Sequence, residues 1–324
     1  MHCPASLPCR PCRNRRRADA MIPQLFHPDE LRAQTLAGFG GVGGGIYPAM
    51  PDQHRAFFAA LPYLFVATLD EQGWPIATLF TGPPGFLRTP DDTHLRISAP
   101  RRSDDPAQAL LLPGKPVGAL GLDFSNRRRN RANGAVSRTD KNRVEILVQQ
   151  SFGNCPQYIQ RRELYPVDSR PQPVEHLASL DAAAQALIRA ADTCFVASGA
   201  HLALAQGGVD ISHRGGRPGF IHLEGDTLWM PDFRGNRYMN TLGNLLAEPR
   251  AALLFIDFER GDVLHLQGET QILWQTEGHP AVEGAERYWR FDVRRTWRFA
   301  AALPWRGRNL EYSPATLATG VWHR

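Results

Sequence analysis

"GPPGFLRTPDDTHLRIS" (Gly82–Ser98) returns later in the chain in altered form, as "GRPGFIHLEGDTLWMP" (Gly216–Pro231). The Pro-Gly-Phe triplets of the two stretches begin at Pro84 and Pro218, which lie 134 positions apart. Two further pairs of matching residues keep the same separation: Asp123 with Asp257, and Gly134 with Gly268. A period of this length is that of a whole domain and not of a solenoid repeat. The sequence therefore predicts two copies of one module.

The predicted modules divide the chain of 324 residues into residues 21–165 and residues 166–324. The join falls in "YPVDSRPQPVEHL", whose three prolines are typical of a linker. Residues 1–20 form a basic tail, which is either a disordered extension or an incorrectly assigned start, because Met21 opens an ordinary globular sequence. The tail has three cysteines but no fourth ligand beside them, so we expect no metal site there.

The net charge of +5 does not indicate a nucleic-acid partner. The tail holds five arginines and one aspartate, a net charge of +4, which leaves about +1 for the rest of the chain. No apolar run is long enough to span a membrane, so we expect no membrane partner. Beyond the tail only Cys155 and Cys194 remain, which fits the reducing cytoplasm better than a disulfide framework. Cys155 has no general base near it in sequence, so it is not a predicted nucleophile.

Each module is predicted to consist mainly of short strands. Branched and aromatic residues concentrate in "PYLFVATLD" and "CFVASG", and glycine-containing turns separate these from "WPIATLF" and "GGVDIS". The stretches "VGALGLDF" and "AALLFIDF" are apolar almost throughout, so they should be central strands, and Gly268 marks a bulge in a later one. Closely spaced strands with few helices predict a small antiparallel barrel. Helices are expected at residues 51–61, 177–193 and 236–247.

The stretch "DISHRGGRPGF" (Asp210–Phe220) brings two arginines, a histidine, a serine and three glycines together. In a strand, Ser212 and Arg214 share one face, and His213 shares the other face with apolar residues. We expect the apolar face to point into the barrel and the Ser212 face to offer a donor and a cation outside it. Arg217 adds a second cation just beyond a glycine turn. His213 stays open between a satisfied place in the core and, through a local bulge, a place beside a ligand.

A second stretch, "GNRYMNTLGNLLAEP" (Gly235–Pro249), predicts a helix whose start suits an anion. Asn236 is a good N-cap residue, and Arg237 lies in the first turn. A helix start offers free N–H groups and the positive end of the dipole. The first module has "LFTGPPGF" where the second has "SHRGGRPGF", without an arginine, so the charged site is expected in the second module only. The alternative, that the Arg-Gly turn is a solvated hairpin tip, stays open.

At these residues the chain resembles the flavin-nucleotide-binding proteins related to pyridoxamine 5'-phosphate oxidase. The matching stretches are "GVDISHRGGRPGF" and "LWMPDFRGNRYMNTLGNLLAEPRAALLFIDF", with "GPPGF", "RRRNRANGAV" and "SFGNCPQYIQRR" in the first module. The resemblance implies a split-barrel fold in which FMN lies at the interface between two barrels. Two tandem FMN-binding split β-barrels would then form a pseudo-dimer within one chain, and further homodimerisation stays open.

The resemblance also implies a set of cofactor-binding residues: Ser212, His213, Arg214, Arg217, Asn236, Arg237 and Asn240. The members on the strand would lie near the flavin or its phosphate, and those at the helix start would take the phosphate. The resemblance identifies no catalytic residue.

One departure concerns the cations that would bind a phosphorylated substrate. The candidate stretch is "NRRRNRANG" (Asn126–Gly134), in which Arg127, Arg129 and Arg131 would share a strand face. They would form either the other wall of the pocket or a solvated hairpin. A specific oxidation of pyridoxamine phosphate is therefore not indicated.

The leading hypothesis is an FMN-dependent oxidoreductase of the cytoplasm that acts on an unidentified small molecule. The flavin would supply the redox chemistry, and the protein would supply binding and orientation. One alternative is a non-catalytic flavin-binding or sensor protein. Another is a split barrel that binds haem or a deazaflavin.

Overall fold

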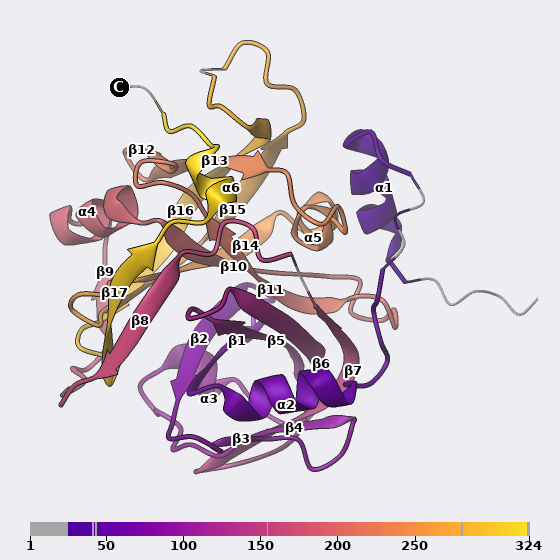
Figure 1. Ribbon diagram of the computed structural model, residues 1–324, viewed down its shortest axis with the longest axis vertical. Helices are drawn as coiled ribbons and strands as arrows, with labels where there is room; N and C mark the ends of the chain where they lie inside the picture. Colours follow the sequence, from indigo (N-terminus) through magenta and orange to yellow (C-terminus); the bar gives the residue numbers. More distant parts are fainter. Residues whose placement is uncertain (1–24, 41, 43, 154, 280, 323–324) are drawn as a thin grey trace, which may run out of the picture.

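The computed structural model describes residues 25–40, 42, 44–153, 155–279 and 281–322, and antiparallel sheets dominate it (Figure 1). The predicted tail lies outside the described residues. No helix in these ranges is both long and apolar enough to cross a membrane. The paired strands of the two large sheets run antiparallel, which confirms the prediction of a mainly β fold.

The first sheet has seven strands in the order β2-β1-β5-β6-β7-β4-β3. Their bounds are β1 Tyr63–Leu69, β2 Pro75–Thr81, β3 Leu87–Arg88, β4 His94–Ile97, β5 Pro116–Asp123, β6 Arg128–Asp140 and β7 Arg143–Gly153. The central strand β5 is buried along nearly its whole length, as the apolar run in its sequence predicts.

The second sheet has the order β11-β10-β14-β15-β16-β13-β12, and β9 also pairs with β16. Its strands are β9 Glu175–Leu177, β10 Thr193–Ala200, β11 Gly208–Gly215, β12 His222–Glu224, β13 Thr227–Phe233, β14 Arg250–Ile256, β15 Val263–Leu273 and β16 Ala285–Phe299. The main path therefore repeats the strand order of the first sheet. Register shifts also occur at Gly134 and at Gly268, which confirms the bulge predicted in β15. The common origin of the two halves stays a prediction.

The remaining elements are one small sheet and six helices in the described residues. They are β8 Arg161–Pro166, which pairs with β17 Trp305–Glu311, and the helices α1 Pro28–Leu36, α2 Asp52–Ala60, α3 Pro106–Ala109, α4 Ala182–Ala190, α5 Asn240–Ala247 and α6 Pro314–Leu317. The prediction for α2 is confirmed. Helix α4 is shorter than predicted, because residues 175–177 form β9 and residues 191–193 lead into β10.

The predicted start of the helix at Asn236 is wrong. Helix α5 begins at Asn240, and its N-cap is Met239, which has a left-handed backbone with φ of 59°. Arg237 also has a positive φ, of 65°. The chain therefore turns irregularly across residues 235–239 before the helix starts. Asn236 instead accepts a hydrogen bond at its side-chain oxygen from the N–H of Tyr238 at 3.2 Å, a local turn contact.

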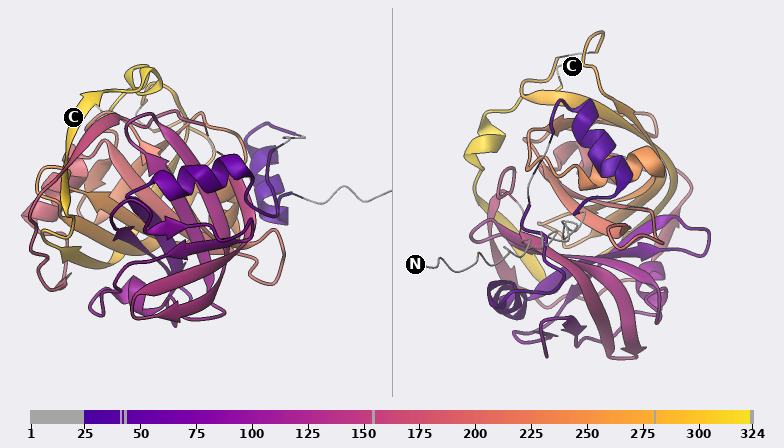
Figure 2. Two further views of the ribbon diagram at one scale, coloured as in Figure 1. Left: turned by 60° about the horizontal axis from the view of Figure 1, so that its bottom comes forward. Right: turned by 90° about the vertical axis from the view of Figure 1, so that its right-hand side faces the viewer.

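The buried apolar residues form three clusters: each large sheet has one of its own, and the third lies between the two sheets. Figure 2 shows the two halves packed face to face. Phe65 on β1 and Phe195 on β10 stack across the contact, with ring centroids 3.7 Å apart. These two strands hold the same position in their sheets, so equivalent residues meet each other. Such a meeting is what an approximate twofold relation between the halves produces.

The predicted orientation of β11 is wrong. Val209 and Ile211 lie in the cluster between the sheets, not inside the second sheet. Cys194 and Val196 on β10 are the register partners of Arg214 and Ser212, and they belong to the core within the second sheet. Both faces of β11 are therefore buried, so an apolar face does not by itself mark the interior.

Helix α1 precedes the first sheet in sequence but packs against the second half. Figure 1 and the right-hand view of Figure 2 place it beside α5. The two helices approach closely where Gly243 faces Glu30, since a Cβ atom on Gly243 would lie 2.6 Å from the Glu30 Cα. We call the described residues between 25 and 50, which include α1, the N-terminal strap.

Candidate functional site

A pocket of about 90 Å³ opens where β6 of the first half approaches β11 of the second. Its walls come from β6, β11, β13, the turn before α5 and the first residues of α5. Five arginines line it against two carboxylates, Asp232 and Glu286. We call it the arginine pocket, after Arg129, Arg131, Arg214, Arg237 and Arg287.

The pocket brings together most of the residues that the sequence singles out. Six of the seven line it: Ser212, His213, Arg214, Asn236, Arg237 and Asn240. Arg217 is not among the lining residues. It lies in the turn after β11, where its carbonyl accepts a hydrogen bond from the N–H of Phe220. The strand and the helix start therefore converge, although they are more than twenty positions apart in sequence.

The first half contributes two arginines to the pocket. Arg129 and Arg131 lie two positions apart on β6, so they share one strand face. Arg127 lies before the strand and turns away, because its Nε donates to the carbonyl of Ile159 at 2.9 Å. Of the two alternatives left by the sequence, the structure thus has Arg129 and Arg131 on the opposite wall.

Arg131 connects the two halves inside the pocket. Its guanidinium donates to Asp210 at 2.5 Å and to the Ser212 hydroxyl. That hydroxyl also lies 2.8 Å from the Oγ1 of Thr241, at the start of α5. These side chains are buried. A buried ion pair with hydrogen bonds to further side chains fixes geometry more surely than it adds stability.

Arg214 is not a free cation, because it shares Asp232 with Arg287. Arg214 donates to one carboxylate oxygen of Asp232 at 2.6 Å, and Arg287 donates to the other oxygen. Arg287 lies on β16, 73 positions after Arg214, and no local sequence pattern marks it. A fork of two arginines on one carboxylate leaves further N–H groups for a second anion.

Several buried donors of the pocket are unsatisfied. The Nε atoms of Arg129, Arg131 and Arg214 have no hydrogen-bond partner among the described residues. Neither ring nitrogen of His213 has one within the described part of the chain, so this side chain is not the satisfied core histidine that the sequence left open. Buried polar groups are normally paired. Together with the excess of arginines, these atoms fit a ligand that brings several acceptor oxygens.

His213 is neutral in this environment. Burial lowers its pKa well below 6.5, and the nearby cations Arg129, Arg162 and Arg214 lower it further. The ring packs edge-on against Phe195, with centroids 5.7 Å apart. A neutral imidazole offers one donor and one acceptor nitrogen, so His213 can contact an uncharged polar edge of a ligand.

The first turn of α5 supplies the helix-end donors that the sequence placed four residues earlier. Asn240, Thr241 and Leu242 line the pocket, and their N–H groups have no acceptor inside the helix. The guanidinium of Arg237 lies over the ring of Phe39 from the strap, 4.1 Å from its centroid. The helix dipole and these donors favour an anion here.

Asn240 has a different role from a direct phosphate donor. Its amide nitrogen donates to Glu30 of the strap at 2.5 Å, and its oxygen accepts from Arg131 at 3.3 Å. Burial raises the pKa of Glu30 to about 8. In the sequence, Glu30 stands three residues after the N-cap His27, a position typical of a capping box. This local pattern gives no sign of the contact between Glu30 and Asn240.

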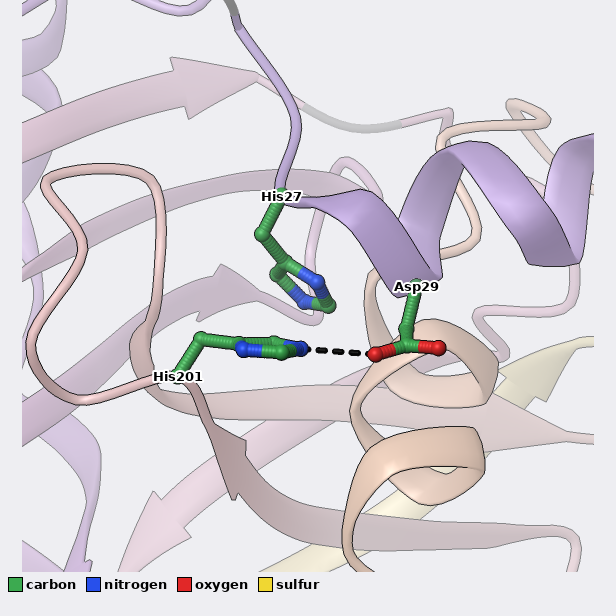
Figure 3. A group of neighbouring side chains, drawn as sticks. All are labelled: His27, Asp29 and His201. Atoms are coloured by element: carbon green, nitrogen blue, oxygen red, sulfur yellow. Dashed lines mark hydrogen bonds and ion pairs between the residues drawn. The ribbon is translucent and has the colours of Figure 1, made fainter.

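A group of His27, Asp29 and His201 holds the strap to the loop after β10 (Figure 3). Their nearest ligand-type atoms lie within 4.8 Å of one another. Hydrogen bonds account for the arrangement: His201 contacts Asp29 at 2.7 Å, and the two ring nitrogens of His27 contact Asn244 at 2.9 Å and the N–H of Glu30 at 3.3 Å. Both nitrogens of His27 are thus engaged within the protein.

No protein-family model and no curated protein matches this chain. Solved structures do match. HupZ of Group A Streptococcus is 15% identical with a TM-score of 0.28, over 37% of this chain and 98% of its own. An FAD-binding protein from Mesorhizobium loti is 13% identical with a TM-score of 0.27, over 39% of this chain and 98% of its own. The MrkH–c-di-GMP complex of K. pneumonia is 13% identical with a TM-score of 0.24, over 79% and 88%. Such low scores establish no function.

Proposed function

We propose that this protein binds FMN in the arginine pocket, between the two halves of an intrachain pseudo-dimer, and works as an FMN-dependent oxidoreductase. The single observation that carries the proposal is an excess of arginines, several with buried and unsatisfied N–H donors, beside the start of a helix. A phosphate monoester has the charge and the acceptor oxygens that this set requires. The sequence resemblance to flavin-nucleotide-binding proteins supplies the identity of the mononucleotide.

The residues divide the work between the two halves. Arg129 comes from the first half and has no carboxylate partner among the described residues, so its charge is available to the phosphate. From the second half, Ser212 and the N–H groups of residues 240–242 would add uncharged donors. Arg131 holds Ser212 in place and at the same time adds positive charge.

When bound, the flavin supplies hydride or electron transfer. The protein's own contribution is to hold and orient it and to limit access of water. His213 would donate or accept a hydrogen bond at an uncharged polar edge of the ring, because its lowered pKa keeps the imidazole neutral. The substrate would be a small molecule that reaches the flavin in this pocket.

Haem is a second candidate, and His213 is the observation that favours it. Its buried ring nitrogens are unpartnered in the described residues, and a neutral imidazole is a common axial ligand of haem iron. The propionates of haem are anions that arginines bind.

The absorption spectrum of the purified protein separates these candidates. We expect flavin bands, and mass spectrometry of the released cofactor should give FMN. A Soret band would contradict the flavin proposal and support haem. Bleaching by NAD(P)H followed by reoxidation in air would support an enzyme, whereas bound FMN that no donor reduces would leave only a flavin-binding protein.

The residue test replaces Arg129 by methionine. Loss of one charge-assisted hydrogen bond costs about 1.5–3 kcal/mol, so FMN should bind roughly ten- to a hundredfold more weakly. The matched control is Arg128→Met on the same strand, because Arg128 is exposed and lies over the Phe57 ring, outside the pocket. Equal FMN affinity in both variants would remove the site assignment.

A further inference from the structure

A second pocket, of about 100 Å³, lies at the corresponding place on the other side of the contact between the halves. Its walls come from β2, the segment after β4 and the start of α3 in the first half, and from β15 and the end of β16 in the second. In the shared strand order, β2 corresponds to β11 and β15 corresponds to β6. We call it the counterpart pocket and define it by Thr78, Phe80, Asp105, Val263, His265 and Phe299.

Strand β2, the equivalent of β11, brings uncharged residues to the counterpart pocket where β11 brings Ser212 and Arg214 to the arginine pocket. The offset of 134 positions relates Ser212 to Thr78 and Arg214 to Phe80. All four residues line their own pockets. The hydroxyl is therefore kept, and the cation is replaced by an aromatic ring.

Strand β15, the equivalent of β6, carries neither of the two arginines. Register shows the correspondence, because Arg131 pairs with Leu120 on β5 and His265 pairs with Leu254 on β14, at the same offset. Val263 then corresponds to Arg129. Burial lowers the pKa of His265 to about 3, so this imidazole is neutral.

The hydroxyl that both pockets share has a carboxylate as its neighbour in the counterpart pocket, where the arginine pocket has a cation. The Thr78 hydroxyl donates to Asp105 at 2.5 Å, whereas Ser212 accepts from Arg131. The other oxygen of Asp105 caps α3, accepting from the N–H groups of Ala107 and Gln108. Asp105 is buried and both of its oxygens accept hydrogen bonds within the protein, so it offers no cation and no donor to a phosphate.

The counterpart pocket is present although the arginines of β6 and β11 have no equivalents in it. Its volume is comparable with the 90 Å³ of the arginine pocket, and its walls include the rings of Phe80 and Phe299 and the aliphatic Val263 and Leu303. The arginine that lines it, Arg102, is paired with Asp104 at 2.8 Å. Walls that combine apolar and aromatic side chains with hydrogen-bonding groups are typical of sites for small uncharged molecules.

We propose that the counterpart pocket is a second binding site, specific for an uncharged aromatic molecule, and that anions bind only in the arginine pocket. The part about anions rests on the proposed function, whereas the aromatic site does not. The hydroxyl of Thr78 and the amide of Gln108 would orient the ligand, and the apolar walls would hold its ring.

Indole is the probe, because it is flat, uncharged and carries one N–H donor. We expect calorimetric titration of the native protein to show one indole site. Ala302→Phe fills the counterpart pocket at a partly exposed position and should weaken indole binding at least tenfold without lowering the flavin content. The matched control is Gln157→Phe, because Gln157 holds the equivalent position in the arginine pocket. Arg131 pairs with Phe152, and Gln157 follows five residues later. In the same way, His265 pairs with Trp297, and Ala302 follows five residues later.

Gln157→Phe should lower the flavin content and leave indole binding unchanged. The proposal is overturned if native protein does not bind indole, if Ala302→Phe binds it as tightly, or if two flavins bind per chain. Indole binding that Ala302→Phe abolishes in a protein that takes up no flavin would overturn the proposed function and uphold the aromatic site.

Discussion

Arg129 illustrates how a binding residue can oppose the stability of the protein that carries it. Burial and the neighbouring Arg131 lower its pKa to about 9, because the folded protein disfavours the charged form. Without a ligand, we expect the free energy of unfolding of Arg129→Met to equal that of the native protein or to exceed it by up to about 1 kcal/mol. Thermal unfolding with and without FMN checks this, since FMN should stabilise the native protein more than the variant. A variant that is clearly less stable without ligand would contradict this role.

Glu30 should make stability depend on pH. Its pKa rises from 4.5 to about 8 on folding, chiefly through burial. The favourable contribution of its neutral form is complete below pH 4.5 and is lost as the pH rises towards 8, because only the unfolded state ionises in that window. Between pH 5 and pH 8 this loss amounts to up to about 4 kcal/mol.

Glu30→Gln should therefore flatten the pH dependence of the free energy of unfolding, measured by urea titration at both pH values. The groups that face Glu30 are His27 on its own segment, Asn240 on α5, Arg131 on β6 and Asp210 on β11. Glu71→Gln, at an exposed acid in the turn between β1 and β2, is the control and should keep the native slope. An unchanged slope in Glu30→Gln would show that Glu30 is ionised in the folded protein.

At the residue scale, chemistry could be predicted from the sequence better than orientation. The alternation in β11 correctly groups Ser212 with Arg214, but the face is inverted because β11 is buried on both sides. Glu30 and Arg287 could not be found, since each meets the pocket residues through contacts that lie far apart in the chain.

The contact between α1 and α5 governs the helix start that lines the arginine pocket. Gly243→Ala places a Cβ atom 2.6 Å from the Glu30 Cα, so the helices must separate. We expect a loss of about 1–3 kcal/mol in the free energy of unfolding, together with weaker FMN binding. Gly40→Ala in the same strap is the control, because nothing lies within 4 Å of its added Cβ. Equal effects of the two variants would contradict a close contact.

The start of α5 shows why element boundaries resist prediction. Asn236 has the side chain of an N-cap residue, but the left-handed backbones of Arg237 and Met239 delay the helix to Asn240. The strap stabilises that turn, since Gln34 donates to the carbonyl of Tyr238 at 3.1 Å and Arg237 lies over Phe39. Such contacts between distant segments carry no local sequence signal.

The two halves should unfold as one unit, because a shared apolar cluster joins them. Phe65→Ala and Phe195→Ala should each cost about 3–5 kcal/mol. The double variant should cost less than the sum by about 0.5–1.5 kcal/mol, the energy of one aromatic pair. Denaturant titration of all four proteins measures this. Strict additivity, or two separate unfolding transitions, would contradict the contact between equivalent strands.

At the scale of the whole molecule, the internal repeat was the strongest signal in the sequence, because its anchors lie in strands and turns whose geometry needs those residues. Gly82 and Gly216 each approach the ring of a phenylalanine four positions later. The contact of α1 with the second half could not be predicted, since it depends on the path of the strap.

A crystal structure of the protein crystallised with FMN tests the central claim most directly. The account predicts one FMN per chain, with its phosphate at the first turn of α5, in contact with Ser212 of the second half and Arg129 of the first. FMN bound elsewhere on the molecule, or a phosphate that contacts neither residue, would contradict it.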